Sequence, residues 1–308
     1  MVKAERPQVA QPEAKSAQPE AKSAPPETKP GLMARYHLSD LWLRAFSALI
    51  LITAAILTLV AGGALFVAFW LLGALAVHWE WQRMIGAPLP WGRLFGGGLA
   101  LCLAATLYRF GQGELAFLTL SLAAAFCAWA AGPGYRLWAA GGVFYAGGLL
   151  LATIALRHAP FFGACAIGWL FAVVWGTDVF AYFGGRLIGG AKLSPRISPG
   201  KTWSGFLVGV FCGAALGALV AHVWRDVNAP LIPLFVLGLI AGALAQGGDL
   251  FESWVKRQFH VKDSSRLIPG HGGFMDRLDG FIAASIFAAL FGLWRGLPSA
   301  AAGLFFWQ

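Results

Sequence analysis

Long apolar runs follow one another from Leu41 onward in this sequence. Each is about 17 to 25 residues long, and a helix of that length crosses roughly 30 Å of bilayer hydrocarbon. Hydrophobic residues make up 58% of the chain and charged residues 12%, whereas about a quarter of a soluble domain is charged. The sequence therefore predicts an all-α polytopic integral membrane protein with about nine transmembrane helices, centred near Ile52, Trp70, Leu101, Leu122, Leu149, Leu170, Val210, Leu239 and Phe287.

The region before the first apolar run has a different composition. The heptapeptide QPEAKSA occurs at 11–17 and again at 18–24, and proline, glutamate, lysine and alanine dominate its surroundings. Such a segment buries too little apolar surface to offset the entropy lost on ordering. It also lacks the apolar core and cleavage site of a signal peptide. We expect residues 1–40 to form a disordered cytoplasmic tail.

The distribution of lysine and arginine predicts the orientation in the membrane. If the amino terminus is cytoplasmic and there are nine spans, twelve basic residues of the loops lie inside and four lie outside. The inner set is Arg83, Arg93, Arg136, Arg186, Lys192, Arg196, Lys201, Lys256, Arg257, Lys262, Arg266 and Arg277, and the outer set is Arg109, Arg157, Arg225 and Arg295. Both long polar loops, at about 184–202 and 249–276, are then cytoplasmic, and a bacterial inner membrane is the expected location.

Two other classes of protein are disfavoured by composition. The net charge of +9 is compatible with nucleic-acid binding, but the basic residues lie in short loops between apolar runs, so we expect no nucleic-acid partner. The four cysteines are Cys102, Cys127, Cys165 and Cys212. They sit in apolar stretches without a CxxC motif or a nearby histidine, which argues against a zinc site or a disulfide framework.

Acidic residues flank the second polar loop. Asp249 ends the sequence GGD after an apolar run, with Glu252 and Lys256 on the same helical face. Asp276 and Asp279 share the first turn of the next predicted helix, where the helix dipole favours negative charge. Helix capping is the alternative for each acid alone. Because Mg²⁺ takes one or two carboxylates together with phosphate oxygens, acids at both ends of a basic loop predict a Mg²⁺ site formed by Asp249 and Asp276.

Between these acids lie groups suited to phosphate binding. Their cations are Lys256, Arg257, Lys262 and Arg277. The sequence PGHGG at 269–273 forces a turn whose backbone amides can approach phosphate oxygens closely. An ordinary interfacial loop that faces anionic lipid is the alternative for any one of these features.

The run from Ser253 to Asp279 resembles the signature of the phosphatidate cytidylyltransferases, also called CDP-diacylglycerol synthases. It reads S-x-V-K-R, four residues, K-D-x-S, two residues, and I-P-G-H-G-G-F-x-D-R-L-D. The segments at 177–186 and 193–202 resemble two further motifs of that family. The resemblance implies a polytopic membrane enzyme that joins CTP to phosphatidate, requires Mg²⁺, releases pyrophosphate and forms a homodimer.

The two upstream segments also have a physical interpretation of their own. Asp178, Tyr182 and Arg186 share one helical face, and an acid within a membrane span is unfavourable unless it is paired or binds a ligand. A simple Asp178–Arg186 ion pair is the structural alternative. The turn SPGKT at 198–202 offers hydroxyls and an ammonium group for a phosphate or nucleotide, but it lacks the GxxxxGK[ST] pattern of a P-loop.

We therefore hypothesise in-line attack by a phosphatidate oxygen on the α-phosphorus of CTP, with residues 41–160 as amino-terminal transmembrane helices and residues 161–308 as the catalytic region. Asp263 and Asp279 are secondary candidates for metal binding or for orienting lysines. His271 and the turn at 198–202 are expected to contact pyrophosphate or nucleotide. The expected catalytic residues are Asp249, Asp276, Lys256, Lys262, Asp263, His271 and Asp279, and the expected substrate-binding residues are Asp178, Tyr182, Arg186, Ser198, Lys201, Thr202, Ser253, Arg257, Gly272, Gly273 and Arg277.

Two alternative functions and one ambiguous acid remain open. The same motifs fit an enzyme that uses CTP with another lipid phosphate, such as an isoprenoid one. A transporter with Asp178, Asp249 and Asp276 as coupling sites is disfavoured, because the polar residues crowd into loops on one side. Glu80 with Arg83 three residues later is typical of an interfacial ion pair, although Glu80 also falls on the side expected to hold the cavity.

Overall fold

The structure, a computed structural model, describes residues 30–224, 227, 230–268 and 272–307. The chain divides into two compact units, residues 1–40 and 41–308. Of the predicted tail, residues 1–29 lie outside the described residues, and residues 30–40 belong to a helix. The second unit contains the rest of the first helix from Leu41 onward and all later elements.

Nine long helices account for most of the described chain, and each contains one of the nine predicted centres. They are α1 (Pro30–Ala61), α2 (Gly63–Met84), α3 (Pro90–Arg109), α4 (Gly113–Ala131), α5 (Arg136–Arg157), α6 (Gly163–Leu187), α7 (Trp203–Val223), α8 (Leu231–Gln258) and α9 (Met275–Trp294). A short helix, α10 (Ala300–Phe305), follows, and the strands β1 (Lys192–Ser194) and β2 (Ser198–Thr202) lie between α6 and α7.

Seven of these described helices, α2 and α4 to α9, are long and apolar enough to cross a membrane. Helices α1 and α3 are not among these seven. The apolar part of α1, Ala45–Ala61, is shorter than the seven spans, and the first turn of α3, PWGR, contains an arginine. The predicted fold class is therefore confirmed as an all-α protein with several membrane-spanning helices. The count of nine spans and the orientation of the amino terminus stay predictions.

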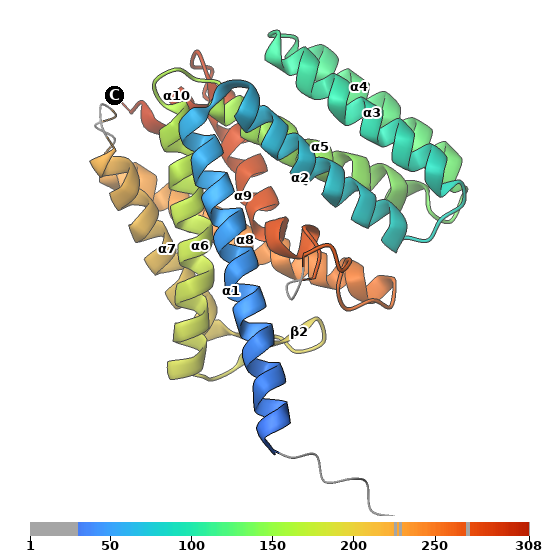
Figure 1. The fold of residues 1–308 in the computed structure, drawn as a ribbon. Coiled ribbons are helices and arrows are strands. Elements are labelled where there is room, and N and C mark those ends of the chain that lie inside the picture. The colour runs from blue at the N-terminus through green and yellow to red at the C-terminus, as the bar shows by residue number, and fades with distance from the viewer. Residues whose placement is uncertain (1–29, 225–226, 228–229, 269–271, 308) are drawn as a thin grey trace, which may run out of the picture. The chain divides into compact units, whose positions relative to one another are not determined.

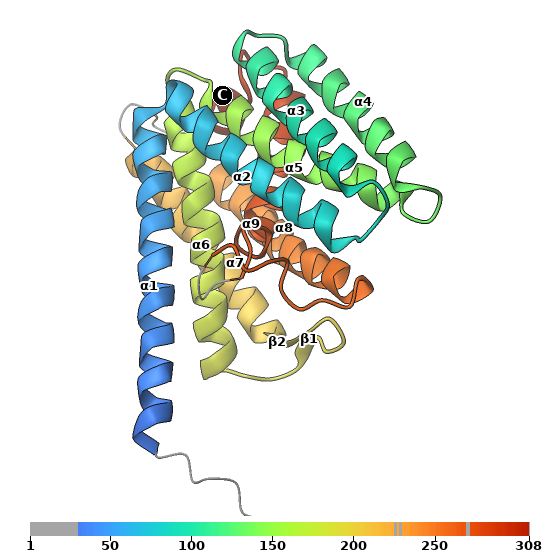
Figure 2. The same cartoon turned by 45° about the vertical axis from the view of Figure 1, so that its right-hand side comes forward.

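The helices pack in two groups that share α5 and α9 as neighbours (Figures 1 and 2). In both views α3 and α4 form an antiparallel pair, which packs against α2 and α5. On the other side α6, α7 and α8 pack against one another, and α8 and α5 both contact α9. The core of the unit therefore lies around α5, α6 and α9, where side chains such as Leu149, Leu170 and Ile282 are completely buried.

Glycines bring α7 unusually close to α6. Gly205, Gly209, Gly213 and Gly217 recur every fourth residue and so line one face of α7. A Cβ atom on Gly209 would lie 2.6 Å from the carbonyl oxygen of Thr177 on α6, so a larger side chain would force the two helices apart. This close packing holds the hairpin that precedes α7 next to the end of α6.

The first predicted polar loop forms an antiparallel hairpin of β1 and β2, in which Ser194 pairs with Ser198 and Lys192 with Thr202. Thr202 then caps α7, because its hydroxyl accepts a hydrogen bond of 3.1 Å from the Gly205 amide. Lys201, one residue earlier, is thus placed at a fixed point between the hairpin and the helix bundle.

A second close approach joins α8 to α9. A Cβ atom on Gly248 would lie 2.6 Å from the carbonyl oxygen of Asp279, and one on Gly280 would lie 3.0 Å from that of Ala245. The backbones of the two helices therefore almost touch at the level of Asp249 and Asp279, which places these two acids beside each other.

Candidate active site

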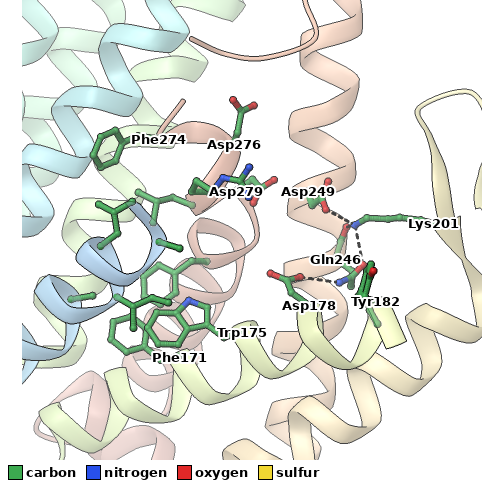
Figure 3. A pocket seen from close by; sticks show the side chains of 18 of the residues that line it. Phe171, Trp175, Asp178, Tyr182, Lys201, Gln246, Asp249, Phe274, Asp276 and Asp279 are labelled. Atoms are coloured by element: carbon green, nitrogen blue, oxygen red, sulfur yellow. Dashed lines mark hydrogen bonds and ion pairs between the residues drawn. The ribbon is translucent and has the colours of Figure 1, made fainter. Parts of the chain in front are cut away.

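A cavity of about 990 Å³ opens between α1, α2, α6, α8, α9 and the hairpin. One wall is apolar, with Trp70 stacked on Phe281 at 4.8 Å between ring centres and Phe171 stacked on Trp175 at 4.5 Å. The opposite wall is polar and is formed by Asp178, Tyr182, Arg186, Lys201, Thr202, Gln246, Asp249, Asp276, Arg277 and Asp279. Figure 3 shows the two walls facing each other.

Lys201 links the hairpin to α8 and, through α8, to α6 (Figure 3). Its Nζ lies 2.7 Å from Oδ2 of Asp249 and donates a hydrogen bond of 2.9 Å to Oε1 of Gln246. The amide nitrogen of Gln246 in turn donates to Oδ1 of Asp178 at 3.2 Å. Sequence reasoning missed Gln246, since a glutamine between alanine and glycine in an apolar run carries no motif.

Asp279 completes this group. It lies beside Asp249 where α8 and α9 approach closely, lines the same cavity as Asp249 and Asp178, and is turned toward Asp249 in Figure 3. We call Asp178, Lys201, Gln246, Asp249 and Asp279 the cavity cluster. It combines three acids with one directly bound lysine, and its members line the open cavity.

Asp276 belongs to a different group. Its carboxylate points away from Asp249 in Figure 3, and Oδ1 forms an ion pair of 2.6 Å with Lys256. Oδ2 accepts hydrogen bonds from the Ser264 amide at 3.1 Å, the Ser264 hydroxyl at 3.0 Å and the Gly273 amide at 2.8 Å. The side chain borders the cavity but is only 8% exposed.

Lys256 is buried between two acids rather than directed into the cavity. Besides Asp276, its Nζ contacts Oε2 of Glu252 at 2.6 Å, and the Glu252 side chain is 1% exposed. The hydroxyl of Ser264 also lies 3.1 Å from Glu80, a completely buried acid on α2. We call Glu80, Glu252, Lys256 and Asp276 the buried cluster. Sequence reasoning placed Lys256 among the phosphate ligands, whereas in the described part of the chain it contacts Glu252 and Asp276 and does not belong to the cavity lining.

The structural alternative for Asp178 is not found. Within the described residues no ion pair joins Asp178 to Arg186; instead Arg186 donates a hydrogen bond of 2.7 Å to the hydroxyl of Tyr182. Tyr182 and Arg186 are both exposed and line the cavity, so the expected common face exists, and it presents a phenol and a guanidinium group to a ligand.

The remaining predicted site residues lie either at the cavity and its bordering acids or away from the cavity. Arg277 lines the cavity, while Ser253 contacts Asp249 at 3.4 Å, and Gly272 has a φ of +81° beside Asp276. Several others lie away from the cavity: Ser198 in β2, and Arg257, Lys262 and Asp263 as exposed residues of α8 and its following loop. His271 lies outside the described residues.

The cavity cluster offers oxygen donors of the kind that Mg²⁺ prefers. Within the described part of the chain, no group of three or more histidine, cysteine, aspartate or glutamate side chains is already arranged around a metal position. In Asp249, however, the Oδ1 atom has only a long contact of 3.4 Å with the hydroxyl of Ser253. The Asp249 side chain is also 35% exposed. Asp249 is thus more accessible to a cation than Asp276, whose two oxygens are already bonded.

Known proteins of similar sequence fall in one family. Residues 42–294 match the model of a family described as the cytidylyltransferase family. A phosphatidate cytidylyltransferase of Brucella abortus is 41% identical over 276 residues, which cover 87% of this chain and 99% of the relative. One from Brucella melitensis shows the same identity and coverage. One from Haemophilus influenzae is 35% identical over 217 residues, or 68% of this chain and 75% of the relative.

Proposed function

The chain belongs to the cytidylyltransferase family, and from that premise we propose that it transfers the cytidylyl group of CTP to phosphatidate, giving CDP-diacylglycerol and pyrophosphate. The two Brucella relatives, which bear the name phosphatidate cytidylyltransferase, match along 99% of their own length, so the likeness extends well beyond the signature motif. The structural observation that supports the proposal is the cavity, because it joins an apolar wall to a charged one.

The two walls suit the two parts of a phospholipid. The aromatic and aliphatic side chains of α1, α2 and α6 can pack against acyl chains, whereas Arg186, Lys201 and Arg277 can neutralise phosphate groups. A lipid that enters from the bilayer would thus bring its phosphate to the cavity cluster without leaving the membrane. CTP, which is strongly charged, would enter from the aqueous side.

The reaction requires alignment and charge neutralisation rather than proton removal. A phosphatidate oxygen that is already ionised at neutral pH attacks the α-phosphorus of CTP, and the bond from that phosphorus to the bridging oxygen breaks as pyrophosphate leaves. The ammonium group of Lys201 has three N–H donors, of which Asp249 and Gln246 take two, so the third can contact a phosphate group. Arg186 and Arg277 would hold the two substrates in line.

The cavity cluster supports a Mg²⁺ site that differs from the predicted pair in one carboxylate. We propose that Asp249 and Asp279 hold it, with Asp178 nearby, because repulsion among three acids on one cavity wall is what a divalent cation relieves. When bound, the ion would supply positive charge to the phosphate oxygens. Asp249 keeps its predicted role, whereas the bonds that Asp276 makes to Lys256 and Ser264 favour Asp279 in its place.

We further propose nine membrane crossings with a cytoplasmic amino terminus. The support is the excess of lysine and arginine in the loops on one side. This topology exposes the hairpin and the loop after α8 to the cytoplasm, where CTP is available, and in a bacterium it places the protein in the inner membrane. The homodimer stays a prediction.

Labelling of single cysteines tests this topology. In a variant without the four natural cysteines, Lys192→Cys in the hairpin and Lys262→Cys in the second loop should react with a membrane-impermeant maleimide only in inside-out vesicles. Reaction of either position in right-side-out vesicles would contradict the proposed orientation.

A direct assay tests the activity. The purified full chain in detergent should convert labelled CTP, Mg²⁺ and phosphatidate into a lipid-soluble cytidine product and pyrophosphate. Undecaprenyl phosphate and other lipid phosphates are run in parallel, and phosphatidate should give the highest kcat/KM. Preference for an isoprenoid phosphate would replace the proposed substrate, and the absence of product with every lipid would refute the proposal.

A further inference from the structure

Glu80 is a buried acid that the reaction scheme above leaves without a role. It lies near the carboxyl end of α2 and its residue is 0% exposed. Contrary to the pairing expected from sequence, the described residues contain no ion pair between Glu80 and Arg83; Arg83 lies over the ring of Trp79, 5.2 Å from its centre. A buried carboxylate without a cation is unfavourable unless several donors satisfy it.

Three donors, and a fourth that is shared with Asp276, bind this carboxylate from the loop after α8 and the start of α9. The amides of Phe274 and Met275 donate to it at 2.8 and 2.7 Å. The hydroxyls of Ser265 and Ser264 lie 2.6 and 3.1 Å from it. Hydrogen bonds to a charged acceptor are roughly twice as strong as neutral ones, so Glu80 is a strong anchor for this segment.

The two amides belong to the unsatisfied amino terminus of α9. A helix leaves its first amides without partners, and a serine, threonine, aspartate or asparagine at the N-cap position normally binds one of them. Here the N-cap residue is Phe274, and no side chain of the N-cap itself bonds to the helix. Glu80 supplies the cap instead, although it precedes Met275 by 195 positions in the chain. Its negative charge also complements the dipole of α9.

The serines extend this anchor to Asp276. Ser264 lies between the two acids, 3.1 Å from Glu80 and 3.0 Å from Asp276, and its single hydroxyl proton can serve only one of them at a time. Its amide also donates to Asp276 at 3.1 Å. The loop after α8, the first turn of α9 and α2 are therefore joined through one residue.

We propose that Glu80 is a positioning residue of the active site: as a cap supplied by α2, it fixes the first turn of α9 and thereby the places of Arg277 and Asp279 in the cavity. This inference rests on the proposed roles of these two residues. Because a misplacement of about 1 Å can lower a rate about 100-fold, loss of the cap should impair catalysis even in a folded protein.

The test compares Glu80→Gln and Glu80→Ala with Glu114→Gln, a control at an exposed acid in the first turn of α4. The full chain is purified in detergent, and size exclusion selects folded protein. We expect kcat to fall about 10-fold for Glu80→Gln and about 100-fold for Glu80→Ala, with KM for both substrates changed less than threefold. The control should retain the wild-type kcat.

Amide hydrogen exchange separates positioning from simple loss of stability. In Glu80→Gln the peptides that cover 273–280 should exchange at least about 10-fold faster, whereas peptides of α5 and α7 should keep the wild-type rate. Ser265→Ala, which removes one donor and keeps the carboxylate, should show the same pattern to a smaller extent. It also provides the test if the Glu80 variants do not fold.

Two results would overturn the inference. One is a folded Glu80→Ala protein with kcat within about twofold of wild type, and the other is a reduced kcat with unchanged exchange at 273–280. Hydrogen exchange needs no turnover, so the inference remains testable even if the wild-type protein forms no cytidine product, a result that would refute only the proposed function.

Discussion

The cavity cluster and the buried cluster contain the same kinds of residue but differ in access and in bonding. Each combines three acids with one lysine, and both draw on α8 and α9. In the cavity cluster, the Lys201 and Asp249 side chains are 19% and 35% exposed. In the buried cluster, the side chains of Lys256, Glu252 and Asp276 are 11%, 1% and 8% exposed.

The difference shows how a protein can use one chemistry for two purposes. In the buried cluster, donors already satisfy Asp276 and Glu80, so its charges hold helices together. In the cavity cluster, Lys201 forms its ion pair with only one of the three acids, Asp249, and the acids line an open cavity in which a ligand or cation can bind. Variants of the two clusters should therefore separate activity from stability.

The largest expected effect is on activity, in the cavity cluster. Asp249→Asn removes the charge that we assign to the metal while it preserves the size of the side chain, and kcat should fall at least about 10³-fold. The thermal midpoint should remain close to that of wild type. Turnover of CTP with phosphatidate measures kcat, and a thermal melt in detergent measures the thermal midpoint. Near wild-type turnover by folded Asp249→Asn would remove Asp249 from the site.

The next largest effect is on stability, in the buried cluster. Lys256→Met leaves Glu252 and Asp276 buried without their cation, and loss of one partner of a buried pair destabilises a protein by about 3–5 kcal/mol. A steep drop in the thermal midpoint should result. Arg257→Met changes the adjacent, exposed residue and serves as the stability control. Equal midpoints for the two variants would show that the buried cluster does not hold the fold together.

Lys201→Met provides the matching test in the cavity cluster. Its ion pair with Asp249 is partly exposed, so its loss should change the free energy of unfolding by less than about 1 kcal/mol. If Lys201 binds phosphate during the reaction, kcat/KM for CTP should fall about 100-fold. Lys192→Met, an exposed lysine in the same hairpin, should leave kcat/KM unchanged. Equal kcat/KM values for the two variants would exclude Lys201 as a phosphate ligand.

The smallest and sharpest effect concerns metal affinity. In Asp279→Asn, the Mg²⁺ concentration for half-maximal activity should rise about 10-fold, because one carboxylate ligand is lost. Asp276→Asn should lower the thermal midpoint while it leaves the Mg²⁺ requirement near that of wild type. Titration of activity with Mg²⁺ distinguishes the two acids. A raised requirement in Asp276→Asn alone would restore the pair predicted from sequence.

Much of the site was accessible from sequence because its residues lie in short motifs. Asp178 and Asp249 were identified from their positions at the ends of apolar runs and Lys201 from the turn SPGKT, and all three line the cavity. Gln246 and Glu80 were not identified in this way, since neither stands in a motif and their partners lie 45 to 195 positions away. Lys256 and Asp276 share the signature motif with Asp279, but their burial depends on packing.

The sequence by itself determined the helices, because the length and hydropathy of a membrane-crossing segment are properties of consecutive residues. It also predicted that the candidate site draws on the two polar loops, and residues of both border the cavity. Only the tertiary structure decided which lysine neutralises which acid and which acids stay accessible. That choice depends on distances of a few ångströms between helices, which are set where Gly248 lets α8 touch α9 and where Glu80 caps a helix that begins far along the chain.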